Sequence, residues 1–262
     1  MDIARYINPS CRNYVEKINM IWAENLRMRH LAVTSKEISP THKKFTTEGK
    51  VLPNYGLTVV APISINSHLF VRMREVKNEI LKQLEALDLL GKVFPLPPET
   101  MHMTISGLEH QPGVDIPERN RIEIAEKVRQ LFSGLSSEKT LSPLRFIVSG
   151  LAYYHRSVLI GRVYPFSDGD FIGLLDLHDS LRPAVGKETK PFVGHVSLAY
   201  IVQTCSADEF SALVGVLENY SEQVFGELLI EKLELRHFSN MINYGKRPLV
   251  ELVLSPPSLH NK

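Results

Sequence analysis

Residues 101–108, MHMTISGL, and residues 192–202, FVGHVSLAYIV, alternate apolar and polar side chains in the way that is typical of half-buried β-strands. Residues i and i+2 of a strand point to the same face. His102 and Thr104 therefore share a face of the first predicted strand, and His195 and Ser197 share a face of the second. Each strand presents an imidazole beside a hydroxyl, one pair in each half of the chain.

The segments around these two strands predict an alternation of strands and helices. We expect a strand at 56–63, helices at 67–90 and 117–133, two strands within 144–164, helices that open with capping boxes at Ser167 and Ser206, and closing strands at 228–238 and 248–255. Each half of the chain thus supplies strands, one histidine-bearing strand and two helices. The pattern predicts an α+β fold of two pseudo-symmetric lobes, each an antiparallel sheet with helices on its outer face.

The domain boundaries follow from where this regular pattern begins and ends. Residues 1–54 are predicted to be an N-terminal helix, with an apolar stripe between Tyr14 and Leu26, followed by an extended polar segment. Residues 55–255 are predicted to form the bilobal domain, and residues 256–262 a C-terminal tail.

Charge and composition limit the classes of partner. The 262 residues include 30 basic and 29 acidic side chains, a net charge of +1, whereas proteins that hold long nucleic acid usually carry a clear basic excess. No window approaches the roughly 18 to 20 apolar residues of a membrane span, and the N-terminus lacks the layout of a signal peptide. We expect a cytoplasmic protein without a long nucleic acid or membrane partner, and its oligomeric state stays open. We expect Cys11 and Cys205 to be buried or incidental thiols that form no disulfide and no metal site.

The bare His-x-Ser/Thr pattern is common in this chain, so its context decides which copies matter. Five of the ten histidines match it: His102, His155, His178, His195 and His237. We interpret three as chance matches, because His178 lies in a helical stretch, His155 follows a turn and His237 precedes a polar loop. The other two histidines lie in strands whose alternate positions are apolar, and these two define the predicted site.

Two imidazoles and two hydroxyls facing each other can perform acid–base chemistry on a phosphate. Imidazole donates or accepts a proton near neutral pH, and a hydroxyl can donate a hydrogen bond to a phosphate oxygen. The predicted catalytic residues are His102, Thr104, His195 and Ser197. The sequence contains neither a metal-binding motif nor a nucleoside triphosphate loop, so we expect no metal and no cofactor.

Substrate contacts are predicted on two hairpins. A nucleotide cleft needs an aromatic ring to stack on the base and a cation for phosphate, and the candidates are Tyr154 with Arg156 and Tyr244 with Lys246. The alternative interpretation is that these are ordinary exposed hairpin residues. Tyr200 is out of phase with His195 and is expected to face away from the cleft, and the run HKK at 42–44 is expected to be solvated.

The segments MHMTISGL and GHVSLAY resemble the paired motifs of the 2H phosphoesterase superfamily, which includes bacterial RNA-ligase-like cyclic phosphodiesterases and nucleotide 2′,3′-cyclic phosphodiesterases. The order of elements is also similar, with a Pro-rich turn at 94–98 before the first motif, and the resemblance covers roughly residues 55–255. It implies a metal-independent hydrolase of phosphodiester bonds, with His195 as the base and His102 as the acid. The N-terminal extension implies an uncharacterised branch.

The expected substrate is a 2′,3′-cyclic phosphate on a nucleotide or an RNA end, which suggests a role in RNA processing. Three alternatives stay open. The same site could act on a 2′,5′ linkage, a cyclic oligonucleotide or a cyclic phosphate of ADP-ribose. The protein could instead bind a nucleotide without turnover. Finally, both histidines could be purely structural, which would require them to be buried and bonded to the main chain.

Overall fold

The computed structural model describes Glu16, Met20 and residues 37–40, 44–46, 48–138, 142–154, 157–188 and 192–254. The helix predicted between Tyr14 and Leu26 lies almost wholly outside these residues, as do Arg156 and the tail at 256–262. Within the described residues, no helix is long and apolar enough to cross a membrane.

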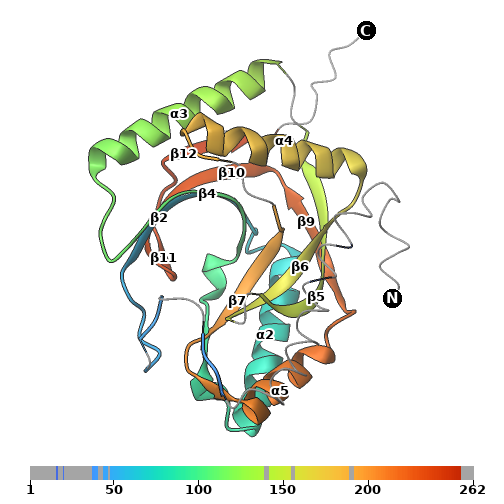
Figure 1. Cartoon of the computed structure of the whole chain (residues 1–262). Helices are drawn as coiled ribbons and strands as arrows, with labels where there is room; N and C mark the ends of the chain where they lie inside the picture. The colour runs from blue at the N-terminus through green and yellow to red at the C-terminus, as the bar shows by residue number, and fades with distance from the viewer. Residues whose placement is uncertain are drawn as a thin grey trace.

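The main sheet contains ten antiparallel strands and curls around the centre of the molecule (Figure 1). Its strands run in the order β11, β10, β2, β4, β7, β6, β5, β9, with β12 paired to β10 and β3 paired to β7. Their bounds are β2 Asn54–Pro62, β3 Val93–Pro95, β4 His102–Pro112, β5 Leu144–Tyr154, β6 Val158–Pro165, β7 His195–Ile201, β9 Val224–Ile230, β10 Lys232–Asn240, β11 Asn243–Tyr244 and β12 Val250–Val253. A separate two-stranded sheet pairs β1, Glu37–Ile38, with β8, Cys205–Ser206.

Two lobes meet at the junction of β4 and β7. The first lobe comprises β10, β2 and β4 with β11 and β12, and the second comprises β7, β6, β5 and β9 with β3. The junction is one antiparallel pair, Met103 opposite Val196. The two-lobed antiparallel α+β fold expected from the sequence is therefore confirmed. The lobes are not the two halves of the chain, however, because the C-terminal strand β10 pairs with β2.

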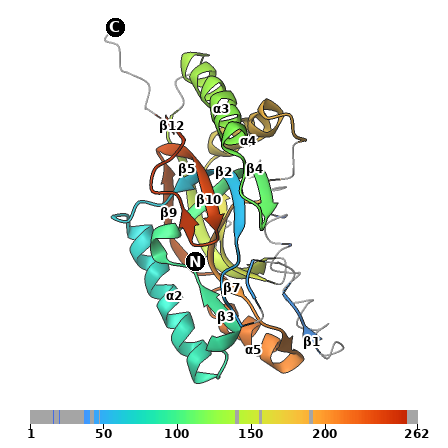
Figure 2. The ribbon, with the colours of Figure 1, turned by 90° about the vertical axis from the view of Figure 1, so that its left-hand side faces the viewer.

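Two helices cover each lobe (Figures 1 and 2). Helices α3, Glu118–Glu138, and α4, Asp168–Ala184, lie over the first lobe, with α4 against β4 and α3 against β12. Helices α2, His68–Ala86, and α5, Ala207–Glu218, lie at the opposite end, with α2 against β9 and α5 against β5. The chain therefore crosses from one lobe to the other after β2. Two one-turn 3-10 helices, Leu90–Lys92 and Pro98–Thr100, lead into β3 and β4.

Several predicted boundaries differ from the structure for local reasons. The helix expected to reach residue 90 ends at Ala86, because Asp88 adopts a positive φ of 58°. The strand expected at 228–238 is two strands, β9 and β10, because the chain leaves β5 and joins β2 there. The capping box at Ser206 is confirmed. At Ser167 only half of it forms, because the Asp170 carboxylate accepts from the backbone N–H of Arg145 instead.

Two apolar clusters fill the interior. The larger one lies between the sheet and its helices and includes Met103, Ile105, Val196 and Leu198, which alternate with the motif residues. The smaller one lies beside the cleft and consists of Phe45, Leu96, Tyr200, Val202, Phe238 and Met241. Phe45 belongs to the segment before the two-lobed domain, so this smaller cluster attaches that segment to the sheet.

Gly56 on β2 permits a close approach that the smaller cluster requires. A Cβ at this position would meet the Phe238 ring and would lie 2.8 Å from the backbone oxygen of Glu109. We expect Gly56→Ala to lower the free energy of unfolding by about 1 to 3 kcal/mol, because the backbone oxygen of Glu109 and the buried Phe238 ring leave no room for a methyl group. Denaturant unfolding measures this change.

Gly134 in α3 supplies the matched control, because a Cβ there meets nothing within 4 Å. Gly134→Ala should raise the free energy of unfolding by up to about 1 kcal/mol through helix propensity alone. Equal effects of the two substitutions would contradict the close approach at Gly56.

Candidate active site

The two motif histidines are held by the same kind of backbone contact. The Nδ1 atom of His102 lies 2.7 Å from the carbonyl oxygen of Thr100, and Nδ1 of His195 lies 2.9 Å from that of Val193. A carbonyl oxygen only accepts, so each Nδ1 carries a proton and donates it. In each neutral ring Nε2 is therefore the nitrogen that can take up a proton. Both imidazoles are fixed in one tautomer by a residue two positions earlier.

The register of β4 and β7 places the four motif side chains around one point. Because Met103 pairs with Val196, His102 lies across from Ser197 and Thr104 lies across from His195. The four side chains are partly exposed, whereas Met103 and Val196 are fully buried beneath them. The alternation expected from the sequence is thus present in both strands, and it turns the histidines and hydroxyls into the cleft.

An aromatic ring flanks each histidine. The Tyr244 ring meets His102 edge-on, with ring centroids 4.8 Å apart, and the Tyr154 ring is tilted against His195 at 5.1 Å. Both tyrosines line the cleft, and their role as substrate contacts stays a prediction. Lys246 is exposed and is not among the cleft residues, so the structure gives no support for its role as a phosphate contact.

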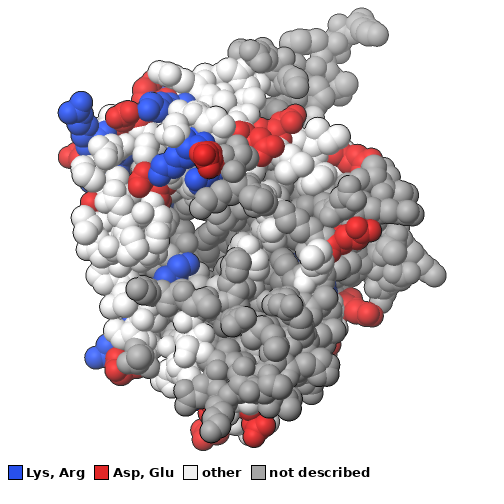
Figure 3. Space-filling view, in the orientation of Figure 1, with Lys and Arg blue, Asp and Glu red and all other residues white. Residues whose placement is uncertain are grey.

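The cleft between the lobes has a volume of about 550 Å³. The motif residues form one part of its lining, and it continues along β4 to Ser106 and His110 and along β7 to Tyr200. Figure 3 shows this face of the molecule hollowed near its centre, with acidic and basic side chains mixed above the hollow. In the described part of the chain β4 pairs with β7 only at Met103, so the lobes separate beyond this point and leave room for a ligand.

The electrostatic setting of His102 favours its neutral form. Burial of the ring lowers its pKa from 6.5 to about 4, although the hydrogen bond to Thr100 opposes the shift. The charges of His195 and Arg236 lower the pKa further. His102 is therefore neutral at pH 7 in the unliganded protein and can accept a proton.

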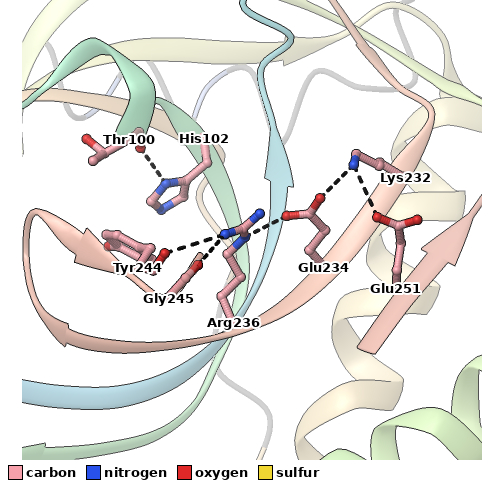
Figure 4. Close-up of polar contacts among 8 residues, drawn as sticks. All are labelled: Thr100, His102, Lys232, Glu234, Arg236, Tyr244, Gly245 and Glu251. Atoms are coloured by element: carbon pink, nitrogen blue, oxygen red, sulfur yellow. Dashed lines mark hydrogen bonds and ion pairs between the residues drawn. The ribbon is translucent and has the colours of Figure 1, made fainter. Parts of the chain in front are cut away.

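Arg236 on β10 fixes the wall behind His102 (Figure 4). Its guanidinium donates to the backbone oxygen of Gly245 at 2.8 Å and pairs with the buried Glu234 at 2.6 Å. Glu234 also accepts from Lys232 at 2.7 Å, and Lys232 reaches Glu251 at 3.1 Å. This row of alternating charges holds the turn that carries Tyr244, and so it holds the Tyr244 ring against His102.

Tyr200 faces the cleft, contrary to the expectation from its phase. β7 has a register shift against β6, where Ala199 and Ser197 pair with the consecutive residues Leu159 and Ile160. Such a bulge inserts an extra residue and reverses the phase of the residues that follow. Tyr200 therefore lies on the same side as His195 and joins the smaller apolar cluster.

The position of Lys44 also differs from the expectation. The sequence favoured a solvated HKK run, but Lys44 lines the cleft and its Nζ donates to the Tyr200 hydroxyl at 3.2 Å. His42 and Lys43 lie outside the described residues. Ser106 is another cleft residue that the sequence analysis missed, although it continues the i, i+2 phase of His102 and Thr104. Its Oγ is buried and has no hydrogen-bond partner among the described residues.

Two of the histidines interpreted as chance matches lie in structural roles. His178 on α4 is buried, with Nδ1 2.7 Å from the carbonyl oxygen of Ile105, and Arg182 one turn later donates to the carbonyl oxygen of Gly107 at 2.6 Å. His237 bonds Asp115 at 3.0 Å and is not among the cleft residues. His155 lies outside the described residues. Among the described residues, no group of three or more His, Cys, Asp or Glu side chains is arranged to hold a metal ion.

Comparison with known proteins gives one match to a family model and several solved structures of similar fold. Residues 44–112 match the family model described as 2H-phosphodiest, a domain of unknown function (DUF1868). The matched segment includes Lys44 and the first histidine motif. No curated protein sequence matches the chain.

Solved structures share the fold at low sequence identity. A conserved protein of unknown function, ATU0111 from Agrobacterium tumefaciens, is 18% identical, with a TM-score of 0.56 over 80% of this chain and 93% of that one. LigT of E. coli in complex with ATP is 12% identical, with a TM-score of 0.47 over 78% and 99%. TT0787 of Thermus thermophilus is 16% identical, with a TM-score of 0.45 over 77% and 99%. The first shows a shared fold alone, and the other two are too distant to support an argument.

The low pKa of His102 makes stability depend on pH in a defined window. The unfolded chain binds a proton near pH 6.5 and the folded chain near pH 4, so acidification favours the unfolded state between these values. At about 1.4 kcal/mol per pKa unit, the loss attributable to His102 amounts to about 3 kcal/mol. Chemical denaturation at pH 7, 6, 5 and 4 should therefore give a shallower decline for His102→Asn than for wild type. Parallel declines would contradict the lowered pKa of His102.

Proposed function

We propose that the protein is a metal-independent phosphodiesterase that opens a 2′,3′-cyclic phosphate on a nucleotide or an RNA end. The match of residues 44–112, which carry the first motif, to the 2H-phosphodiest family model supports this proposal. The observation that carries the proposal is the matched placement of two imidazoles. Each donates Nδ1–H to a carbonyl oxygen two residues earlier, and each has a hydroxyl residue across the strand pair. Histidines with purely structural roles would not require a matched partner on the opposite lobe.

The reaction is an in-line displacement at phosphorus. One imidazole takes a proton from water through Nε2 as the water oxygen bonds to phosphorus. On the opposite side the bond from phosphorus to a ribose oxygen breaks, and the other imidazole gives that oxygen a proton. Thr104 and Ser197 donate hydrogen bonds to the non-bridging oxygens, where charge develops in the transition state. The proton taken from water and the proton delivered to ribose balance over one turnover.

The environment of His102 supports the role of base in the unliganded protein. The resemblance implies the opposite assignment, with His195 as base. A base must be unprotonated when substrate arrives, and His102 satisfies this condition at any pH well above 4. We therefore propose that His102 accepts the proton of water and His195 protonates the leaving oxygen, with the roles exchanged in the reverse reaction.

The cleft also accommodates a nucleoside next to the reacting phosphate. Tyr154 and Tyr244 stand on opposite lobes, each beside one histidine, and offer flat apolar surface for a base or ribose. Base stacking on an aromatic ring contributes about 1 to 3 kcal/mol and depends little on base identity. A nucleotide or RNA end is therefore the proposed partner.

Substitution of any of the four motif residues should strongly reduce turnover. Hydrolysis of nucleoside 2′,3′-cyclic phosphates, followed in EDTA by chromatography, should fall by about 10² to 10⁴ in His102→Ala and His195→Ala. Thr104→Ala and Ser197→Ala should reduce kcat by about 10² to 10³, because each removes a donor to the developing charge.

His237→Gln is the matched control, because His237 has the same His-x-Ser pattern but is not among the cleft residues. It should retain wild-type activity. Tight nucleotide binding with no turnover of any cyclic phosphate would replace the proposal with a binding function, and turnover of a 2′,5′ linkage or an ADP-ribose cyclic phosphate alone would change the substrate.

The pH dependence of kcat/KM tests the assignment of roles. This parameter reports the groups of the free enzyme, so with His102 as base its acidic limb should fall only near pH 4. Rates measured between pH 3.5 and 8 for wild type locate that limb. An acidic limb near the ordinary histidine value of 6.5 would contradict the assignment.

A further inference from the structure

The segment before the two-lobed domain contributes a cation to the cleft. Phe45 pairs with Val51 in an isolated β-bridge, and the N–H of Leu52 bonds the carbonyl oxygen of Lys44 at 2.9 Å. The Phe45 ring is buried against Phe94, with centroids 4.8 Å apart, and against Tyr200 at 5.2 Å. These apolar contacts of Phe45 fix the backbone next to Lys44. The hydrogen bond to Tyr200 then fixes the ammonium group of Lys44 in the cleft.

Lys44 differs from the other cations of the cleft in having no anionic or carbonyl partner among the described residues. Lys187 pairs with Glu109 at 2.6 Å, and Arg182 bonds the backbone of Gly107 at 2.6 Å. The partner of Lys44 is the neutral hydroxyl of Tyr200, and burial lowers the pKa of Lys44 to about 8. A partly desolvated ammonium without an opposing charge favours an anion beside it.

This cation lies away from the reacting phosphate. The charge of Lys44 affects His110 at the rim of the cleft, whereas the charges that affect His102 are those of His195 and Arg236. Along the strands, His110 lies eight residues from His102, and Tyr200 lies five residues from His195. Lys44 therefore lies beyond the histidine pair along the cleft, next to Tyr200. It therefore faces a different part of the ligand.

We propose that Lys44, held in place by its hydrogen bond to Tyr200, binds a second phosphate group of the substrate, attached at the 5′ position of the nucleoside. The inference rests on the proposed function: in a nucleoside 2′,3′-cyclic phosphate the 5′ oxygen is the ribose position that remains for a second phosphate. Ser106 lies on β4 between this subsite and Thr104, and its buried Oγ has no hydrogen-bond partner among the described residues. Its hydroxyl can therefore contact the part of the ligand between the two phosphates. The preferred substrate is thus a 5′-phosphorylated nucleotide or the last residue of an RNA chain.

Kinetics on matched substrates test this subsite. Wild type should hydrolyse 5′-phosphorylated nucleoside 2′,3′-cyclic phosphates with kcat/KM about tenfold above the 5′-hydroxyl forms, mainly through a lower KM. Lys44→Met retains the length and apolar stem of the side chain and should remove this preference, with the larger loss of kcat/KM on the 5′-phosphorylated substrates. Lys44→Arg should keep part of the preference. An equal loss on both substrates, or the absence of a preference in wild type, would overturn the proposal.

Lys50 on the same hairpin is the matched control, because it is exposed and is not among the cleft residues. Lys50→Met should retain the wild-type preference. Calorimetric binding of nucleoside 3′,5′-bisphosphates and 3′-monophosphates adds a readout without turnover. Bisphosphates should bind about tenfold more tightly, and Lys44→Met should remove the difference. A Lys44-dependent difference in a protein without turnover would refute the proposed hydrolysis and retain the subsite, whereas turnover without the difference would refute the subsite alone.

Discussion

The antiparallel pair between Met103 and Val196 is the contact on which the candidate site depends. It joins β4 to β7, and the four motif side chains stand on either side of it. Met103 and Val196 are fully buried in a close-packed core, which resists displacement of the strands that carry them. The spacing between the histidines is thus set by backbone pairing and core packing. Beyond this pair the lobes separate, so the same junction that aligns the catalytic groups also determines where the cleft begins.

The wall of the site beside His102 combines an aromatic ring with a row of paired charges. His102 is shielded by Tyr244 and held by a carbonyl oxygen, and behind Tyr244 a row of alternating charges runs from Arg236 to Glu251. A chain of paired charges can hold a loop without adding net charge near the substrate. Burial is the main cause of the low pKa of His102, and the positive charge of Arg236 lowers this pKa further. Arg236 therefore holds the turn that carries Tyr244 and also lowers the proton affinity of His102.

The sequence predicted the elements of this fold and the four motif residues because both depend on local periodicity. His102 and His195 stand in strands whose alternate positions are apolar, and the structure keeps that phase. The orientation of Tyr200 could not be predicted, because a bulge depends on pairing with β6 and leaves no local signature. Lys44 looked solvated because its neighbours are polar, and the Phe45 contacts that bring it to the cleft are with residues far away in sequence. The composition of the two lobes could not be predicted for the same reason, because the pairing of β10 with β2 joins residues far apart in sequence.

Beyond Met103, the edge of β4 that faces β7 pairs with no strand among the described residues, and this affects the tendency of the protein to associate with itself. His178 and Arg182, four residues apart on α4, bond the carbonyl oxygens of Ile105 and Gly107, two residues apart on β4. Four helical residues rise about 6.0 Å and two strand residues span about 6.6 Å, so one face of a helix matches the acceptor spacing of a strand edge. A strand whose outward carbonyls are already bonded offers a poor template for a foreign strand. The cleft can therefore stay open to substrate, while the bonded carbonyl oxygens disfavour β-strand pairing between chains and the aggregation that follows from it.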